Sequence, residues 1–232
     1  MLRGSTPRTL AWLRQEYGDF AGAVELNRES RDLGHRIKNG NVEISALIDI
    51  GFNDLALRGP APAVELFEQT LERARKAFGA HRWRWTIHLL FGLTTALIAL
   101  GRDGEALAQA ERGLREAEAS ESLKYVGWFH ARRGELALRA GDAAAAVQSL
   151  ERAPAIARRI RYPTLTWQAA DVLGCARMRL GDAERARAAA RLAEETLAAI
   201  AAAAPEPALA QTLRNWPRAQ EMQETLERVR RM

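Results

Sequence analysis

The chain has 232 residues, of which 47% are hydrophobic and 27% are charged, a balance that excludes wholesale disorder. Good helix formers dominate, with 45 alanines and 31 arginines, and no alternating β-branched run predicts a sheet. The net charge of +5 is spread along the chain, and the single cysteine, Cys175, excludes an internal disulfide and a CxxC site.

A glycine followed by an alanine recurs five times along the sequence. The alanines are spaced 40, 43, 40 and 40 residues apart, a period typical of helical repeat proteins. In four copies the glycine precedes the alanine by five residues, whereas the second copy has Arg58 there and Gly59 one position later. The pairs are Gly18 with Ala23, Gly59 with Ala63, Gly101 with Ala106, Gly141 with Ala146 and Gly181 with Ala186.

Each copy reads as two antiparallel helices joined by a tight turn. The recurring glycine fits the left-handed position that follows a helix C-terminus, and Asp142 and Asp182 fit the N-cap of the next helix. The first helix of a copy is called helix A and the second helix B. The pattern predicts helices over 6–17, 20–38, 42–57, 61–79, 82–100, 103–119, 122–139, 143–160, 163–180 and 183–203.

A second set of glycines lies inside three A helices, seven residues before the turn position: Gly51, Gly134 and Gly174. A glycine in the middle of a helix costs about 1 kcal/mol relative to alanine, so we expect close helix contacts to offset this cost. The alanines of the following B helices, Ala63, Ala146 and Ala186, are expected opposite them. The third copy has Thr94 at this position and Gly92 two residues earlier.

The periodic pattern ends after Ala204, where Pro205 and Pro207 break the helix. Two further helices, 207–215 and 217–231, are predicted to cap the last repeat. The expected organisation is a repeat array over 1–204, divided at about 1–40, 41–80, 81–121, 122–161 and 162–204, followed by capping helices over 205–232. The first repeat has no preceding cap, so self-association through it is one prediction.

The spacing of small residues resembles the tetratricopeptide repeat, with glycine at the eighth and fifteenth positions of a unit and alanine at the twentieth. Gly134, Gly141 and Ala146 match it in one copy, and Gly174, Gly181 and Ala186 in another. The aromatic positions match poorly, and the units are longer than the usual ~34 residues. The resemblance implies an all-α, right-handed helix–turn–helix solenoid of about five repeats.

Longer units of this kind resemble the C-terminal arms of bacterial ATP-dependent transcriptional activators and adenylate-cyclase-like regulators. The segments 163–170 and 213–218 are similar to the closing part of such arms. The resemblance implies an arm that receives a signal from a protein or a small effector. The chain itself contains no phosphate-binding GxxxxGK[ST] loop.

No catalytic or metal-binding pattern is found. The histidines, His35, His81, His88 and His130, lack HExxH spacing, and Cys175 is interpreted as a packing residue rather than a nucleophile. We therefore predict a non-enzymatic protein without a cofactor or metal. The N-terminus lacks an apolar export segment and the charge-free stretch 85–101 is short for a membrane span, so a cytoplasmic protein with no membrane partner is expected.

The residues that A helices would present on the concave surface are the candidate binding site, because this surface holds ligands in tetratricopeptide arrays. They mix aromatic and charged side chains, as interfaces do. They are Asp49, Phe52, His88, Phe91, Thr95, Trp128, Arg132, Glu135, Gln168 and Asp171, with Cys175 beside them. Some of them are expected to serve only as packing between repeats.

Four functions remain open at this point. The leading one is a scaffold that binds a peptide or protein on the concave surface. The alternative is a sensor of a small effector, with a pocket near Phe91, Trp128 and Arg132. Nucleic-acid binding is less favoured, although residues 81–85 interleave basic and aromatic side chains; tryptophans that seal two repeats explain this segment better. An enzyme is the least favoured.

Overall fold

The computed structural model describes residues 5–77 and 81–231, and within them it contains thirteen α-helices and no strand. The chain divides into two compact units, Met1–Glu116 and Ala117–Met232. Unit 1 holds α1 (Ser5–Glu16), α2 (Phe20–Arg36), α3 (Gly40–Leu57), α4 (Pro60–Lys76) and α5 (Arg82–Ala99), while α6 (Asp103–Ala119) runs through the division. The expected all-α helix–turn–helix repeat fold is confirmed.

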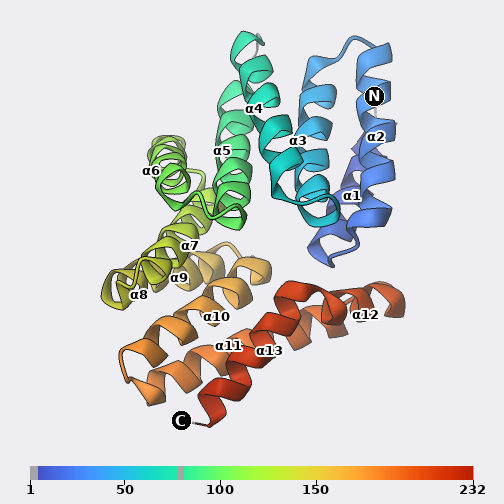
Figure 1. Cartoon of the computed structure of the whole chain (residues 1–232). Helices are drawn as coiled ribbons and strands as arrows, with labels where there is room; N and C mark the ends of the chain where they lie inside the picture. The colour runs from blue at the N-terminus through green and yellow to red at the C-terminus, as the bar shows by residue number, and fades with distance from the viewer. Residues whose placement is uncertain (1–4, 78–80, 232) are drawn as a thin grey trace. The chain divides into compact units, whose positions relative to one another are not determined.

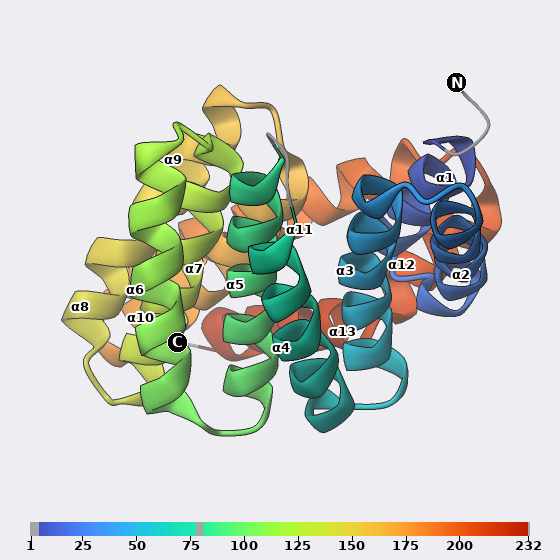
Figure 2. The same ribbon diagram turned by 90° about the horizontal axis from the view of Figure 1, so that it is seen from above.

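In unit 1 the helices form two rows (Figures 1 and 2). The A helices α1, α3 and α5 are neighbours, because α3 packs against both of the others. The B helix α2 packs against α1 and α3, and α4 packs against α3 and α5. Each B helix therefore joins two successive A helices. Helix α4 ends at Lys76, earlier than the expected 79, and residues 78–80 lie outside the described part of the chain.

Unit 2 contains α7 (Leu123–Arg139), α8 (Ala143–Leu150), α9 (Arg152–Arg159), α10 (Pro163–Arg179) and α11 (Ala183–Ala202), then α12 (Pro207–Asn215) and α13 (Pro217–Arg230). The single helix expected over 143–160 is wrong, because it is interrupted at Glu151. Pro154 explains the break, since it has no N–H to donate to the carbonyl of Leu150 and its ring crowds that carbonyl. Helices α8 and α9 both pack between α7 and α10.

The turns inside the helix pairs form as the glycine spacing predicts. The turn glycines have positive φ angles: 76° at Gly18, 95° at Gly59, 73° at Gly101, 87° at Gly141 and 74° at Gly181. In the second copy Arg58 stays in the right-handed region, and the left-handed position moves to Gly59. Asp142 caps α8 by accepting from the Ala145 N–H at 2.9 Å, and Asp182 caps α11 in the same way.

The glycines inside the A helices admit large side chains of the B helices. Phe67 of α4 is fully buried between α3 and α5. A Cβ at Gly51 would overlap its ring, and one at Gly92 would lie 2.6 Å from its Cζ. Phe67 thus occupies a notch that two glycines form, one from each neighbouring A helix. Gly92 supplies the small residue that the third copy lacks at Thr94.

In two of the three copies, the residue that faces the inner glycine is not the expected alanine. A Cβ at Gly134 would overlap the side chain of Leu150, four residues beyond Ala146. Phe67 stands at the same place relative to Ala63, so the expectation is wrong for both of these copies. It holds only in the last copy, where a Cβ at Gly174 would lie 3.6 Å from the carbonyl oxygen of Ala186. In these two copies, the residue that packs against the inner glycine lies four positions after the alanine: Phe67 after Ala63 and Leu150 after Ala146.

This difference gives a matched pair of substitutions. We expect Gly134→Ala to destabilise unit 2 by about 1–3 kcal/mol, because the methyl group overpacks against Leu150. Gly174→Ala should be neutral or stabilise by up to about 1 kcal/mol, since its Cβ has room and alanine favours the helix. Urea unfolding followed by circular dichroism measures both. Equal losses of stability in the two variants would contradict the notch.

Candidate functional site

The predicted site residues of unit 1 lie along one row on α3 and α5, together with Arg8 of α1. We call Arg8, Asp49, Phe52, His88, Phe91 and Thr95 the inner row of unit 1. The Phe52 ring lies 5.1 Å from the His88 ring and 5.7 Å from the Phe91 ring, between centroids. It also meets the Phe67 ring edge-on at 5.1 Å. Phe91 is buried, whereas Phe52 and His88 stay partly exposed.

The charged residues of this row, Arg8 and Asp49, lie at the end nearest α1. Asp49 is buried, and its Oδ2 accepts from the Nε of Arg8 at 2.8 Å. The Arg8 side chain keeps 41% of its surface exposed. Gln15 donates to the Asp49 carbonyl and to Asn53 Oδ1, which fixes α1 against α3. At the other end Thr95 donates to the Phe91 carbonyl within its own helix.

The predicted site residues of unit 2 lie on α7 and α10. We call Trp128, Arg132, Glu135, Gln168, Asp171 and Cys175 the inner row of unit 2. The Arg132 guanidinium lies 5.5 Å from the centroid of the Trp128 ring and pairs with Glu135. The Trp128 ring meets Tyr162 edge-on at 6.2 Å. Trp128, Arg132, Gln168 and Asp171 are all buried.

Helix α13 contacts this second row. The Thr225 hydroxyl lies 3.6 Å from Cys175 Sγ, and α13 packs against both α10 and α11. Trp216, just before α13, meets the buried Trp167 of α10 edge-on at 5.7 Å. The sequence did not predict Arg218 and Thr225 as site residues. The signal for them is the helical spacing that puts Arg218 and Thr225 on the same face of α13 as Met222 and Val229.

The second row brings opposite charges together where the side chains are largely buried. Burial lowers the pKa of Arg132, and the charge of Arg218 lowers it further, while Glu135 opposes both. For Glu135, burial raises the pKa, but Arg132 and Arg218 outweigh it and the net shift is downward. Burial raises the pKa of Asp171 despite the nearby Arg218 guanidinium and Thr225 hydroxyl.

The histidines and the cysteine form no reactive group. Among the described residues no three His, Cys, Asp or Glu side chains are grouped to hold a metal ion. Burial raises the pKa of the Cys175 thiol, so the thiol stays protonated at neutral pH. This favours its interpretation as a packing residue.

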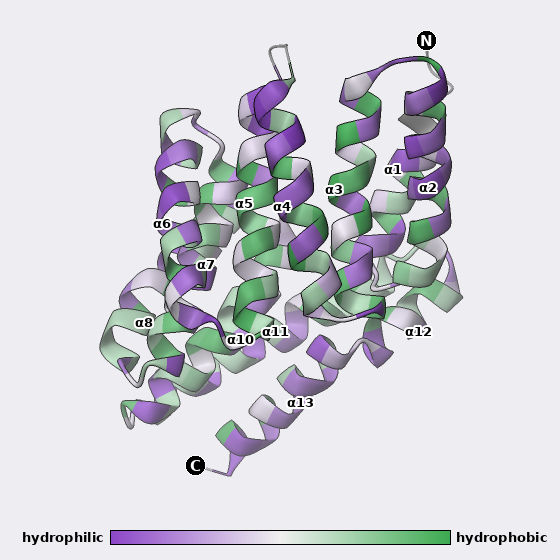
Figure 3. Cartoon of the chain, turned by 45° about the horizontal axis from the view of Figure 1, so that its top comes forward, coloured by the Kyte–Doolittle hydropathy of each residue, from purple (hydrophilic) through white to green (hydrophobic). Residues whose placement is uncertain are grey.

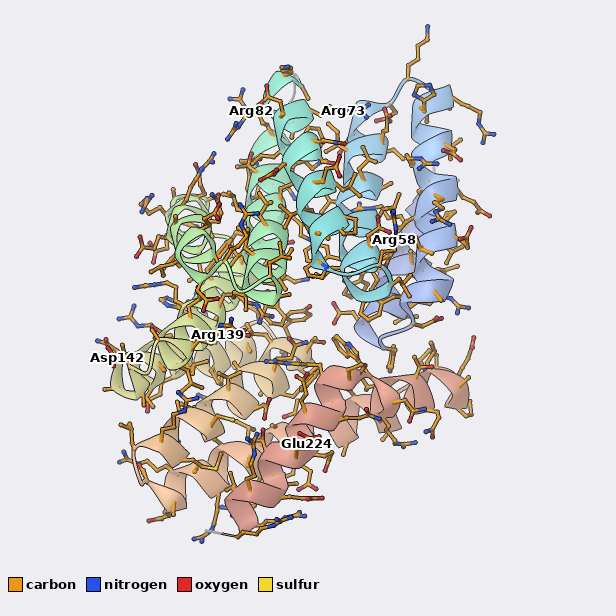
Figure 4. All side chains as sticks on the ribbon, in the orientation of Figure 1. Arg58, Arg73, Arg82, Arg139, Asp142 and Glu224 are labelled. Atoms are coloured by element: carbon orange, nitrogen blue, oxygen red, sulfur yellow. The ribbon has the colours of Figure 1, made fainter. Side chains whose placement is uncertain are left out.

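The basic and aromatic segment at the start of α5 divides into two roles. Trp85 is buried and its indole N–H donates to the Ser45 hydroxyl of α3 at 3.2 Å, so it joins two repeats as expected. Trp83 remains exposed, with the Arg84 guanidinium 6.0 Å from its ring centroid. Figure 4 labels Arg82 at this end of α5 and Arg73 at the same end of α4. Arg73 pairs with Glu43 at 2.8 Å.

Solved structures resemble this arrangement over nearly the whole chain. A thermophilic tetratricopeptide-repeat protein of Thermus thermophilus has a TM-score of 0.62 and 18% identity, with 92% of this chain and 98% of that one covered. The apo form of RapI has a TM-score of 0.61 and 12% identity, covering 99% and 98%. BtubC (BKLC) of P. vanneervenii has a TM-score of 0.60 and 16% identity, covering 94% and 90%.

The chain has a tetratricopeptide-like fold. At these identities the likeness shows the fold alone. Neither a protein family nor a curated protein matches the sequence. The two inner rows lie on A helices of this fold.

Across the described ranges 5–77 and 81–231, no helix combines the length and the apolar character that crossing a bilayer requires.

His130 of α7 gives a prediction for the pH dependence of stability. It is buried, its Nδ1 has no hydrogen-bond partner in the described structure, and burial together with Arg152 and Arg133 lowers its pKa to about 4. The unfolded chain takes up this proton near pH 6.5, so stability falls as the pH drops from about 6.5 toward about 4. Between pH 7 and 5 the loss from this residue should be about 2 kcal/mol.

The measurement is urea unfolding of His130→Gln and wild type at pH 7 and pH 5. The variant should lose about 2 kcal/mol less than wild type over this interval. The same substitution at His35, which is exposed, is the control and should leave the loss unchanged. A His130→Gln variant with the wild-type pH dependence would contradict the assignment.

Proposed function

We propose that the chain is a non-enzymatic interaction scaffold and that it binds a peptide or protein segment on the inner row of unit 1. The observation that carries this proposal is the contact between the rings of Phe52 and His88. Their rings stand 5.1 Å apart with an interplanar angle of 31°, and both remain partly exposed. Rigid aromatic groups of this kind serve as anchors at interfaces, because little side-chain entropy is lost on binding.

The neighbouring residues define the ligand that this row fits. The Phe52 ring packs against the buried rings of Phe67 and Phe91. Its exposed part is an apolar surface that suits an aromatic or aliphatic side chain. The Arg8 side chain is partly exposed beyond its bond to Asp49 and would attract a carboxylate next to that side chain. The favoured ligand is therefore a peptide with an apolar anchor and an adjacent acidic group.

A random peptide library displayed on phage tests this proposal. Peptides enriched on the wild-type chain should carry the apolar and acidic pattern. Phe52→Ala and His88→Ala should weaken the binding of an enriched peptide at least tenfold, or about 1.4 kcal/mol, in a fluorescence anisotropy titration. Leu57→Ala is the matched control, because Leu57 is an exposed apolar residue of the same helix as Phe52.

Circular dichroism melting shows whether each variant remains folded. Failure to enrich any peptide, or enriched peptides that bind the folded Phe52→Ala and His88→Ala variants as tightly as wild type, would contradict the proposal.

We further propose that the chain acts as the signal-receiving arm of a bacterial regulator, with sensing of a small effector as the alternative. The resemblance of 163–170 and 213–218 to the ends of such arms supports this. A thermal-shift screen against a metabolite panel distinguishes the two, since a peptide scaffold should show no shift. Binding to random single strands at two salt concentrations tests the less favoured nucleic-acid function. The cytoplasmic location and self-association through the first repeat stay predictions.

A further inference from the structure

Four helix ends meet at one end of unit 1: the end of α2, the start of α3, the end of α4 and the start of α5 (Figures 1 and 4). The Oε1 of Glu43 on α3 lies 2.8 Å from the Arg73 guanidinium of α4 and 3.6 Å from His35 Nδ1 of α2. The bond from Trp85 to Ser45 brings the start of α5 to α3. We define the basic edge of unit 1 as the exposed residues of 35–38, 73–76 and 82–84.

The net positive charge of the chain is concentrated at this edge. The chain has 34 lysines and arginines and 29 aspartates and glutamates. Segments 35–43 and 72–84 contain seven of these cations and only two of the anions, Glu43 and Glu72. The rest of the chain holds 27 of each, so the whole excess of +5 lies in these two segments. The even distribution of charge expected from the sequence is therefore wrong.

The two carboxylates of these segments leave most of the positive charge unbalanced. Glu72 is shared by Arg75 at 3.4 Å and Lys76 at 3.2 Å. Figure 3 shows the ends of α2 and α4 as hydrophilic. Four further cations of the edge form no ion pair with a carboxylate of the described residues: Arg36, Lys38, Arg82 and Arg84.

Helix stability explains the cations of α2 and α4 but not those of α5. Basic residues in the last turn of a helix interact favourably with its macrodipole, which accounts for Arg36, Arg73 and Lys76. Arg82 and Arg84 lie instead in the first turn of α5, where the macrodipole is positive and disfavours cations. An anionic partner would relieve this repulsion.

Two exposed apolar side chains accompany the cations. Trp83 keeps 45% of its surface exposed, with the Arg84 guanidinium 6.0 Å from its ring centroid, and Ile37 keeps 55% exposed. Tryptophan and arginine are the residues enriched among the anchors of protein interfaces. A sugar-phosphate backbone gains little from Ile37, whereas an apolar side chain of a protein segment would cover it. The edge therefore suits a protein segment better than a nucleic acid.

We propose that the basic edge of unit 1 binds an acidic, amphipathic segment of a partner protein. The carboxylates of the segment would pair with the arginines at the start of α5 and the end of α2. Its apolar side chains would pack on Trp83 and Ile37. The edge shares no residue with the inner row of unit 1, so this inference goes beyond the binding proposed there and does not depend on it.

A fluorescein-labelled peptide of four Glu-Glu-Leu repeats is the probe, and fluorescence anisotropy with the full chain measures its binding. The double variant Arg82→Glu, Arg84→Glu should weaken binding at least tenfold. Trp83→Ala should weaken it about fivefold, because the apolar contact is lost. Glutamate in the first turn favours a helix, so the double variant should melt no lower than wild type and its lost binding does not reflect unfolding.

The matched control is the double variant Arg185→Glu, Arg191→Glu in α11 of unit 2. Both arginines are exposed, and Arg185 is the third residue of its helix, as Arg84 is of α5. The control has the same net charge as the edge variant and should bind the probe within about twofold of wild type, since exposed charges away from the site are screened. Equal losses in the two double variants would show a general attraction to net charge and would overturn the proposal.

Three further results would also overturn it. The first is that the wild-type chain does not bind the probe. The second is that Phe52→Ala weakens probe binding as much as the edge variant does, which would place the peptide on the inner row. The third is that an oligothymidylate with the same number of charges binds the edge more tightly than the peptide, which would assign the edge to nucleic acid.

Discussion

The arrangement of both units depends on large B-helix side chains that seat against glycines of the A helices. Phe67 fills the notch between Gly51 and Gly92, and Leu150 lies against Gly134. Glycine inside a helix costs about 1 kcal/mol, but full burial of a phenylalanine or leucine stabilises by about 1.5–3 kcal/mol. The exchange is favourable because the absent Cβ lets the ring or isobutyl group reach the helix backbone. The distance between neighbouring A helices follows from it.

This seating also determines what the A helices present. The Phe52 ring meets Phe67 edge-on and lies tilted against His88 and Phe91 of α5, so the buried Phe67 ring supports the partly exposed Phe52 ring. The aromatic platform of unit 1 is therefore an extension of the core and not an isolated surface patch. The second unit differs, because its row carries more charge and Thr225 of α13 contacts it at Cys175.

The periodic part of the fold could be predicted because the signals for it are local. A turn glycine and its capping aspartate, such as Gly141 and Asp142, act within one turn of chain, and the structure places them as the spacing indicates. The residue facing an inner glycine could not be predicted in the same way. Ala146 and Leu150 lie one turn apart on the same face, and only the crossing of the helices decides which of them meets Gly134.

The candidate site shows the same limit more strongly. The contact between Cys175 and Thr225 joins residues from two helices far apart in sequence and follows from the path of the chain after Pro205. No periodic pattern contains that path, because the period ends at Ala204. Pro154 is a simpler case, since its effect on the preceding carbonyl is local and the alanine-rich context only masks it.

Phe67 between two glycines has a consequence for how this array tolerates change. Because the Phe67 ring packs against both Gly51 and Gly92, the effects of substitutions at positions 51, 67 and 92 depend on one another. An enlargement at either glycine can be compensated by a smaller residue at 67, but that smaller residue then leaves a void at the other glycine. The energies of such double variants will not add, and the three positions are expected to vary together.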